Sequence, residues 1–354
     1  ESSGDFEVIA ANDFDPDNLV AFKANHPNAT TWEGSIENLD PVHLMEELGL
    51  KTGELDVMVG GPPCQGFSRN RARRHFGGYF VDDPRNYLFK EYLRFVKAFL
   101  PRVVVIENVA DMLVKENGRF GTEILETLSE LGYNEAQAGV LNAADFGVPQ
   151  RRRRAIIIAS REGSIPLPTA THAKPNNNDE LFGLPHWRTI RDAIGDLPSI
   201  AGGEGSSPCA YRSDPSNDYQ ELMREGSESL TDHIGWKLSK IQSDRLNYLS
   251  PGQGAADLPN HLAPKSAYGS AYRRMSWDIP ALTITTWMYH PGSGMYFHPS
   301  DHRTITVREG ARIQSFPDRV LFTGGKVARC RQVGNAVPPL LATAIASQIS
   351  DKII

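Results

Sequence analysis

Short apolar runs rich in β-branched residues alternate with amphipathic stretches through the first half of the chain. The runs of strand length lie near residues 6–11, 55–59, 103–106, 137–141 and 155–159, and helical spacing of apolar positions marks residues 16–25, 88–99 and 119–131. The run Val103-Val104-Val105-Ile106 is wholly apolar, which is typical of a strand buried on both faces of a parallel sheet. This alternation predicts an α/β fold built on a central sheet.

The pattern changes from Pro166 onward, where prolines and the run Asn176-Asn177-Asn178 indicate a linker. Periodicity stays weak to about residue 300, and the aromatics there are of an exposed type. Helical spacing returns at residues 307–317 and after Pro338-Pro339. We therefore expect two domains, one of them discontinuous: residues 1–185, a smaller domain at 186–304, and a return segment at 305–354 that completes the first. The smaller domain suits a recognition module, or a poorly patterned β domain without a partner.

Composition is that of an ordinary globular protein, with 354 residues, 40% hydrophobic and 23% charged. No apolar stretch is long enough to span a bilayer, and no signal pattern opens the chain. Three widely spaced cysteines argue against a disulfide framework and show no metal-ligand spacing. We expect a cytoplasmic protein, without a bound metal and monomeric.

A net charge of −6 argues against a nucleic-acid partner, but the basic residues are clustered. Arginines gather at residues 69–74, at 151–154 and around Cys330. Each cluster alone is as readily a solvated face. The first two adjoin the motifs described next, which favours contact with phosphates.

Cys64 lies in the loop Gly60-Gly61-Pro62-Pro63-Cys64-Gln65-Gly66-Phe67-Ser68, directly after an apolar run. In an open α/β sheet, ligands collect at the carboxyl ends of the strands, so this position presents the thiol to a substrate. An average free cysteine is more often a small core residue. The glycines and prolines around Cys64 do not fit a core, whereas we expect Cys209 and Cys330 to be structural.

Four further motifs follow this loop in a fixed order. They are Glu107-Asn108-Val109, Gln150-Arg151-Arg152-Arg153-Arg154, a stretch from Arg308-Glu309 to Phe316-Pro317, and Gln332-Val333-Gly334-Asn335-Ala336-Val337-Pro338. With the Pro-Cys dipeptide, this set resembles the DNA cytosine-C5 methyltransferases, of the bacterial modification-enzyme type. The resemblance implies a Rossmann-like, S-adenosylmethionine-dependent methyltransferase sheet with a second, smaller target-recognition domain. It also implies methyl transfer to C5 of a flipped cytosine in a specific double-stranded DNA sequence, within a restriction-modification system.

The resemblance assigns roles to the motif residues. Cys64 is the nucleophile that adds to cytosine C6, and Glu107 is the acid at N3. Arg154 holds the cytosine carbonyl, while Arg152 and Gln150 support the site. Flipping costs roughly a few kcal/mol, which contacts to DNA offset. We expect those contacts from Arg69, Arg71, Arg73, Arg74, Arg273 and Arg274.

The cofactor site is implied in the same way. Its expected members are Asp13, Phe14, Ser35, Ile36, Pro62, Leu88, Asn335 and Val337. From the residues alone, Asp13 is more readily a helix cap than a ligand for ribose hydroxyls. Ser35 stands where the family usually has an aspartate. Residues 1–5 also lack the family's glycine-rich turn, so we expect the first strand and that turn to be missing from this chain, and cofactor binding to be weak.

Two alternatives stay open on the sequence. One is an RNA (tRNA) cytosine-C5 methyltransferase that uses the same residues. The other is a catalytically inactive DNA-binding or regulatory relative.

Overall fold

The computed structural model describes residues 4–62, 88–114, 118–175, 183–267 and 269–354. Within them, a four-stranded sheet has the order β3-β4-β7-β5. Strand β3 runs parallel to β4, whereas β7 is antiparallel to both β4 and β5. The strands are β3 (Val57–Gly60), β4 (Val103–Val109), β5 (Gln137–Asn142) and β7 (Arg153–Ser160). The predicted α/β sheet is therefore confirmed, with β7 reversed relative to β3 and β4.

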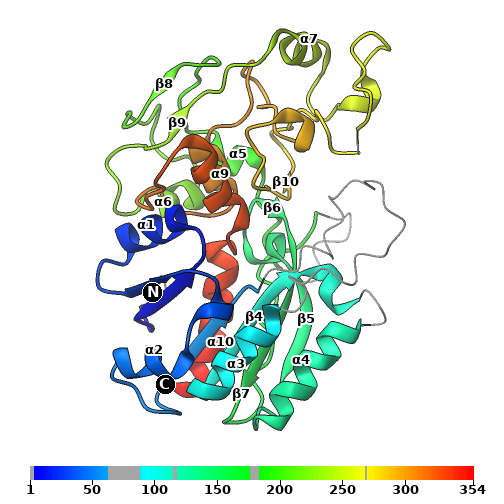
Figure 1. The fold of residues 1–354 in the computed structure, drawn as a ribbon. Helices are drawn as coiled ribbons and strands as arrows, with labels where there is room; N and C mark the ends of the chain where they lie inside the picture. The colour runs from blue at the N-terminus through cyan, green and yellow to red at the C-terminus, as the bar shows by residue number, and fades with distance from the viewer. Residues whose placement is uncertain (1–3, 63–87, 115–117, 176–182, 268) are drawn as a thin grey trace.

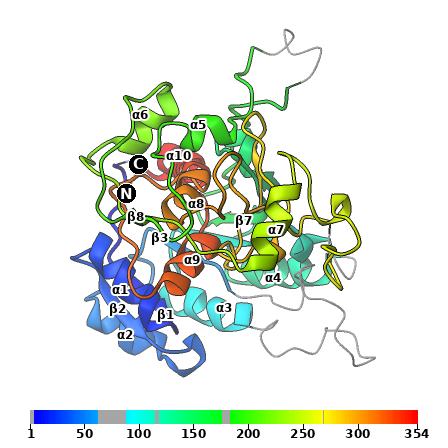
Figure 2. The ribbon, with the colours of Figure 1, turned by 90° about the horizontal axis from the view of Figure 1, so that it is seen from above.

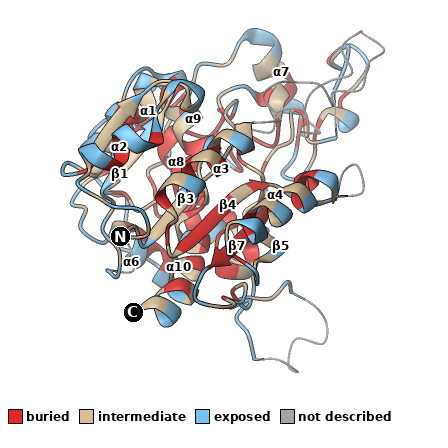
Figure 3. Ribbon diagram, turned by 60° about the horizontal axis from the view of Figure 1, so that its bottom comes forward, coloured by how far each residue is buried: buried red, intermediate tan, exposed pale blue. Residues whose placement is uncertain are grey.

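Helices cover both faces of this sheet (Figure 1), namely α3 (Leu88–Phe99) and α4 (Arg119–Glu130) on one face and α10 (Pro339–Ile353) on the other. Alternate residues of β4 point to opposite layers: Val104 and Ile106 pack with α3 and α4, whereas Val103 and Val105 pack with α10. Figure 3 shows β4 and β7 as largely buried strands between these helices. Burial on both faces explains the uninterrupted apolar run in β4.

A separate two-stranded parallel sheet precedes this core. It consists of β1 (Ala10–Asp13) and β2 (Thr30–Glu33), with α1 (Pro16–Asn25) between them and α2 (Pro41–Glu47) after them. Helix α1 has the predicted bounds. The strand predicted at 6–11 is displaced, because pairing with β2 begins only at Ala10, and Asn12 extends it by donating from Nδ2 to the carbonyls of Trp32 and Gly34.

The middle segment, residues 186–304, lies above the sheet in Figure 1. Its elements are short: α5 (Ile190–Ile194), β8 (Gly205–Ser206), α6 (Asp218–Arg224), β9 (His233–Ile234), α7 (Lys240–Tyr248) and β10 (Ala281–Leu282). Strand β10 pairs with β6 (Gln150–Arg151), just before β7. Short 3₁₀ helices occupy Ile36–Asn38, Ala110–Leu113, Ala143–Phe146, Ala255–Asp257 and Pro291–Ser293.

Two helices of the return segment pack with the middle segment. They are α8 (Val307–Ile313) and α9 (Lys326–Asn335); α8 packs with α5, and Figure 2 shows α8 between α5 and α9. Ala311, Ile313 and Val333 share one core with Ile190 and Met223. The predicted boundary at 304/305 therefore runs through one hydrophobic core, and only α10 returns to the sheet.

Buried charges reinforce this junction. Glu309 of α8 accepts from both terminal nitrogens of Arg303, at 2.7 and 2.8 Å, and from the backbone of Thr306 at 2.7 Å. Arg312 similarly bonds to Asp318 at 2.6 Å and to Asp196 at 3.2 Å. Because an unpaired buried charge is costly, these pairs fix how the middle segment sits on α8.

Across the described ranges, every helix is too short or too polar to serve as a membrane span.

Candidate active site

Glu107 and Arg154 form an ion pair at the end of the sheet from which the loop with Cys64 was predicted to start. Arg154 Nε lies 2.6 Å from Glu107 Oε1, and the two side chains are only 13% and 16% exposed. Glu107 lies within β4 and not after it, and the antiparallel register pairs Val109 of β4 with Arg154 of β7. Adjacent strand ends thus bring together two residues that are far apart in the sequence.

The same strand end holds the start of the cysteine loop. Asn108 donates from Nδ2 to the carbonyl of Pro62 at 2.9 Å. A Cβ built at Gly61 would lie 3.4 Å from Glu107 Oε2, so the carboxylate sits beside the backbone three residues before Cys64. Cys64 itself lies outside the described residues. No role for Asn108 was predicted from the sequence, although a polar residue at the carboxyl end of a buried strand is a signal for one.

Gly60 is required by close packing at this point. Its Cβ would fall 2.2 Å from the ring of Tyr92, whose hydroxyl donates to the carbonyl of Met58 at 2.9 Å. Only glycine leaves room for this ring. Tyr92 therefore fixes the last residue of β3 and the direction in which the chain leaves the sheet.

Gln150 and Arg152 point inward, as the predicted alternation requires, while Arg151 and Arg153 are exposed. Arg152 donates from Nη1 to the carbonyl of Ile284 at 2.8 Å and from Nη2 to those of Gly334 and Ala336, both at 2.9 Å. It thereby ties the middle segment to the end of α9. Burial lowers the pKa of Arg152, and the charge of neighbouring Arg154 lowers it further.

Gln150 has a matching role. Its Oε1 accepts from the backbone of Ile284 at 2.7 Å, and its Nε2 donates to Oε1 of Gln314 at 2.7 Å. Gln150 and Arg152 hydrogen-bond to backbone groups and to Gln314, which is the geometry of residues that position others. Their supporting roles in the reaction stay predictions.

Residues expected to hold the cofactor lie at the ends of several elements. Asp13 ends β1; its Oδ1 accepts from the backbone of Asp15 at 2.8 Å and its Oδ2 from Asn18 at 3.1 Å. Asp15, not Asp13, caps α1, so the capping alternative for Asp13 is wrong. A carboxylate held in this way keeps further acceptor sites for ribose hydroxyls, and the ring of Phe14 beside it is 74% exposed. This geometry fits a nucleoside.

The other expected cofactor residues are placed as follows. Ser35 donates to Glu37 Oε2 at 2.9 Å, and Ile36 packs near Met58 of β3. Leu88 begins α3, Asn335 ends α9 and is exposed, and Val337 packs against the core below α10. Their roles toward a cofactor stay predictions.

The arginines expected to contact DNA fall into two groups. Arg69, Arg71, Arg73 and Arg74 lie outside the described residues. Arg274 donates to the carbonyls of Leu249, His298, Pro299 and Ser300, and burial lowers its pKa. These bonds occupy its guanidinium within the middle segment and give Arg274 a structural role, while its contact with DNA stays a prediction. Arg273 is half-buried, and its role stays a prediction.

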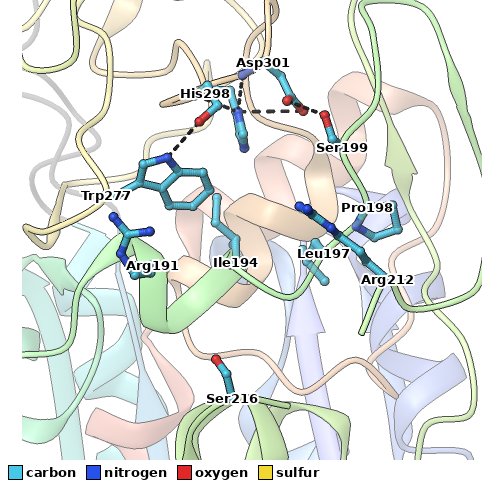
Figure 4. A pocket seen from close by; sticks show the side chains of 12 residues that line it. Arg191, Ile194, Leu197, Pro198, Ser199, Arg212, Ser216, Trp277, His298 and Asp301 are labelled. Carbon is cyan, nitrogen blue, oxygen red and sulfur yellow. Dashed lines mark hydrogen bonds and ion pairs between the residues drawn. The ribbon is translucent and has the colours of Figure 1, made fainter. Parts of the chain in front are cut away.

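A cavity of about 490 Å³ opens in the middle segment, away from the predicted site residues (Figure 4). Its lining includes Trp277, His298 and Asp301, with Arg191 and Arg212 at its sides. Trp277 donates to Ser300 Oγ at 2.8 Å, and burial lowers the pKa of His298. No residue of the Glu107–Arg154 site lines this cavity, so it does not extend that site.

Comparison with known proteins agrees with this geometry. The profile of the family described as C-5 cytosine-specific DNA methylase matches residues 1–351. The type II methyltransferase M.AgeI of Thalassovita gelatinovora is 33% identical, over 97% of this chain and 94% of that protein. M1.HphI of Haemophilus parahaemolyticus, also a type II methyltransferase, is 34% identical over 97% and 81%.

Among solved structures, one described as a prophage-encoded DNA modification methyltransferase (E. coli) superposes with a TM-score of 0.74. Its sequence identity is 23%, with 98% of this chain and 93% of that chain covered, so it supports the fold alone. The profile and the curated relatives confirm the resemblance drawn from the motifs. The chain belongs to the family of C-5 cytosine-specific DNA methylases.

Proposed function

We propose that this chain transfers a methyl group from S-adenosylmethionine to C5 of a flipped cytosine in a specific double-stranded DNA sequence, with Cys64 as the nucleophile. The observation that carries the proposal is the Glu107–Arg154 ion pair of 2.6 Å beside Gly61. It places a carboxyl group and a fixed cation beside Gly61, three residues before Cys64 in the sequence. Asn108 holds the backbone two residues before Cys64 through the Pro62 carbonyl.

The chemistry needs these groups because C5 of cytosine is a weak nucleophile. The Cys64 thiolate adds to C6, and the electron pair of the C5–C6 double bond moves toward C5 as N3 takes a proton from Glu107. Arg154 hydrogen-bonds the cytosine carbonyl and holds the ring in place. After methyl transfer, a base removes the C5 proton, the C5–C6 double bond re-forms as the thiolate leaves C6, and N3 returns its proton to Glu107.

The cofactor, when bound, supplies an electrophilic methyl group on a sulfonium. Asp13 is placed to accept hydrogen bonds from ribose hydroxyls, and the exposed ring of Phe14 to stack on adenine. Asn335 lies at the end of α9, next to the carbonyls of Gly334 and Ala336 that Arg152 holds. Arg152 thus helps to position both the middle segment and the residues around Asn335 at the end of α9.

We place sequence choice in residues 186–304, because this segment stands apart from the sheet and joins it through the short β10–β6 pairing, through the bonds of Gln150 and Arg152 to Ile284, and through α8 and α9. The type II relatives favour a modification enzyme acting in a bacterial cytoplasm. Exchanging residues 186–304 for those of a relative should move the methylated sequence and keep the C5 product. A chimera that still methylates the original sequence would contradict this division.

The function is tested by methyl transfer with a labelled cofactor to duplex DNA and, separately, to transfer RNA. We expect 5-methylcytosine in the DNA alone, identified after hydrolysis by mass spectrometry. Arg154→Ala should lower kcat at saturating DNA by roughly 10²-fold or more, since it removes a charged donor to the reacting ring, whereas Arg153→Ala should keep kcat. Methylation of transfer RNA only, or a product other than 5-methylcytosine, would contradict the proposal.

A further inference from the structure

One tryptophan has its ring largely in solvent. All five tryptophans lie in the described part of the chain, and Trp287 is 58% exposed while the other four are at least half-buried. A single exposed apolar residue is ordinary on a protein surface. Trp287 differs because its backbone and its ring are both held in place, and because of where it lies.

The backbone at Trp287 is fixed on both sides. Its carbonyl accepts from Ser293 Oγ at 2.6 Å and from the backbone of His290 at 2.9 Å. Met288, the next residue, is fully buried in the core shared with α8. The ring is therefore presented by a rigid turn, so little conformational entropy is lost when something packs on it.

The ring also belongs to a preformed stack, which we call the aromatic ladder: Trp287, Tyr289, Trp236 and Lys326. Trp287 stacks on Tyr289 with ring centres 5.7 Å apart, and Tyr289 lies 5.5 Å from Trp236. The ammonium of Lys326 sits 5.3 Å over the ring of Trp236. The ladder offers one exposed aromatic face and carries a positive charge at its other end.

The residues just before Trp287 contact the proposed active site. Thr283, just after β10, donates to the carbonyl of Arg151 at 3.1 Å, and Ile284 is held by Arg152 and Gln150. A Cβ at Gly334 would lie 2.4 Å from the backbone of Thr285 and Thr286, so the end of α9 presses against this turn. Trp287 follows immediately. Its position is thereby fixed relative to the arginine block.

We propose that Trp287 stacks on a DNA base that has lost its stacking neighbour when the target cytosine is flipped out. Within an intact duplex, bases expose only their edges, so an aromatic face has no base face to cover. Extrusion of one nucleotide frees the faces on either side of the gap, and stacking on a side chain recovers part of that loss. The inference rests on the proposed function, and it adds a residue that stabilises the flipped state.

The test uses fluorescein-labelled duplexes, one carrying the sequence that the wild-type protein methylates and one of equal length with that sequence scrambled. Dissociation constants are measured by fluorescence anisotropy for the wild type, Trp287→Ala and Trp287→Phe. Tyr248→Ala serves as the matched control, because Tyr248 is an aromatic residue of the same segment with a similar exposure of 56%. Urea unfolding midpoints verify that the variants are folded.

Trp287→Ala should raise Kd for the target duplex by roughly 5- to 100-fold, while Trp287→Phe and Tyr248→Ala stay within about 3-fold of the wild type. On the scrambled duplex all variants should bind alike. Equal binding of Trp287→Ala and wild type to the target duplex would overturn the inference, as would an equal loss on both duplexes. A wild type that forms no 5-methylcytosine in duplex DNA would instead refute the proposed function.

Discussion

Removal of the Arg152 side chain should destabilise the protein far more than removal of its neighbour. Arg152 is 1% exposed and donates to three backbone carbonyls, those of Ile284, Gly334 and Ala336. Arg152→Ala leaves all three without their donor inside the protein. At roughly 1–3 kcal/mol for each buried group left unsatisfied, with water restoring some of them, we expect a loss of about 3–5 kcal/mol. That is a large fraction of the total stability of a typical domain.

Arg153→Ala is the matched control, since this exposed arginine lies in the same block and should change the free energy of unfolding by less than about 0.5 kcal/mol. Urea unfolding of the two variants, followed by circular dichroism, measures the difference. Arg152→Lys should fall between them, because an ammonium cannot reach three carbonyls in the planar geometry of a guanidinium. Equal unfolding midpoints for Arg152→Ala and Arg153→Ala would refute the proposed role of Arg152 in holding the three carbonyls.

Two further predictions concern acid stability and the cysteine loop. Burial by itself raises the pKa of Glu309, but the charges of Arg303 and His298 lower that pKa well below its usual range. The ionised Glu309 should therefore contribute its full stability above pH 4.5, and this contribution should be lost as the pH falls further. His298, whose pKa burial lowers from 6.5, adds an earlier loss that begins below that pH. Urea midpoints for wild type and Glu309→Gln, measured from about pH 3 to about pH 7, cover both losses. Asn108→Ala frees the Pro62 carbonyl and should lower kcat for methyl transfer more than tenfold while KM for DNA stays within about threefold; an unchanged kcat would contradict the anchoring role.

Much of the fold follows from local patterns. Helix α1 has the predicted bounds because Pro16 and the cap Asp15 set its start. The run at Val103 to Ile106 forms the buried centre of β4, as an apolar β-branched strand should. Glu107 and Arg154 could be predicted as neighbours only through the family resemblance, because the register of β4 against β7 is a long-range property.

Other features depend on contacts that no local pattern records. Helix α9 was not predicted, since its apolar residues are few and lie among the charged Lys326, Arg329 and Arg331; it is stabilised by packing of Cys330 and Val333 into the core of the middle segment. The pairing of β10 with β6 is two residues long and joins positions far apart in the chain. Arg274 illustrates the same limit, because its bonds to backbone carbonyls arise only once the loops around it have folded.

The central claim is that Cys64 forms a covalent bond to C6 of the target cytosine. The most direct test is a duplex carrying 5-fluorocytosine at the methylated position, incubated with protein and cofactor and then denatured. Because fluorine cannot leave as a cation, the complex should persist after methyl transfer, and peptide mapping should place the adduct on Cys64. Cys64→Ser should give no adduct. An adduct on Cys209 or Cys330, or one that forms equally with Cys64→Ser, would contradict the account.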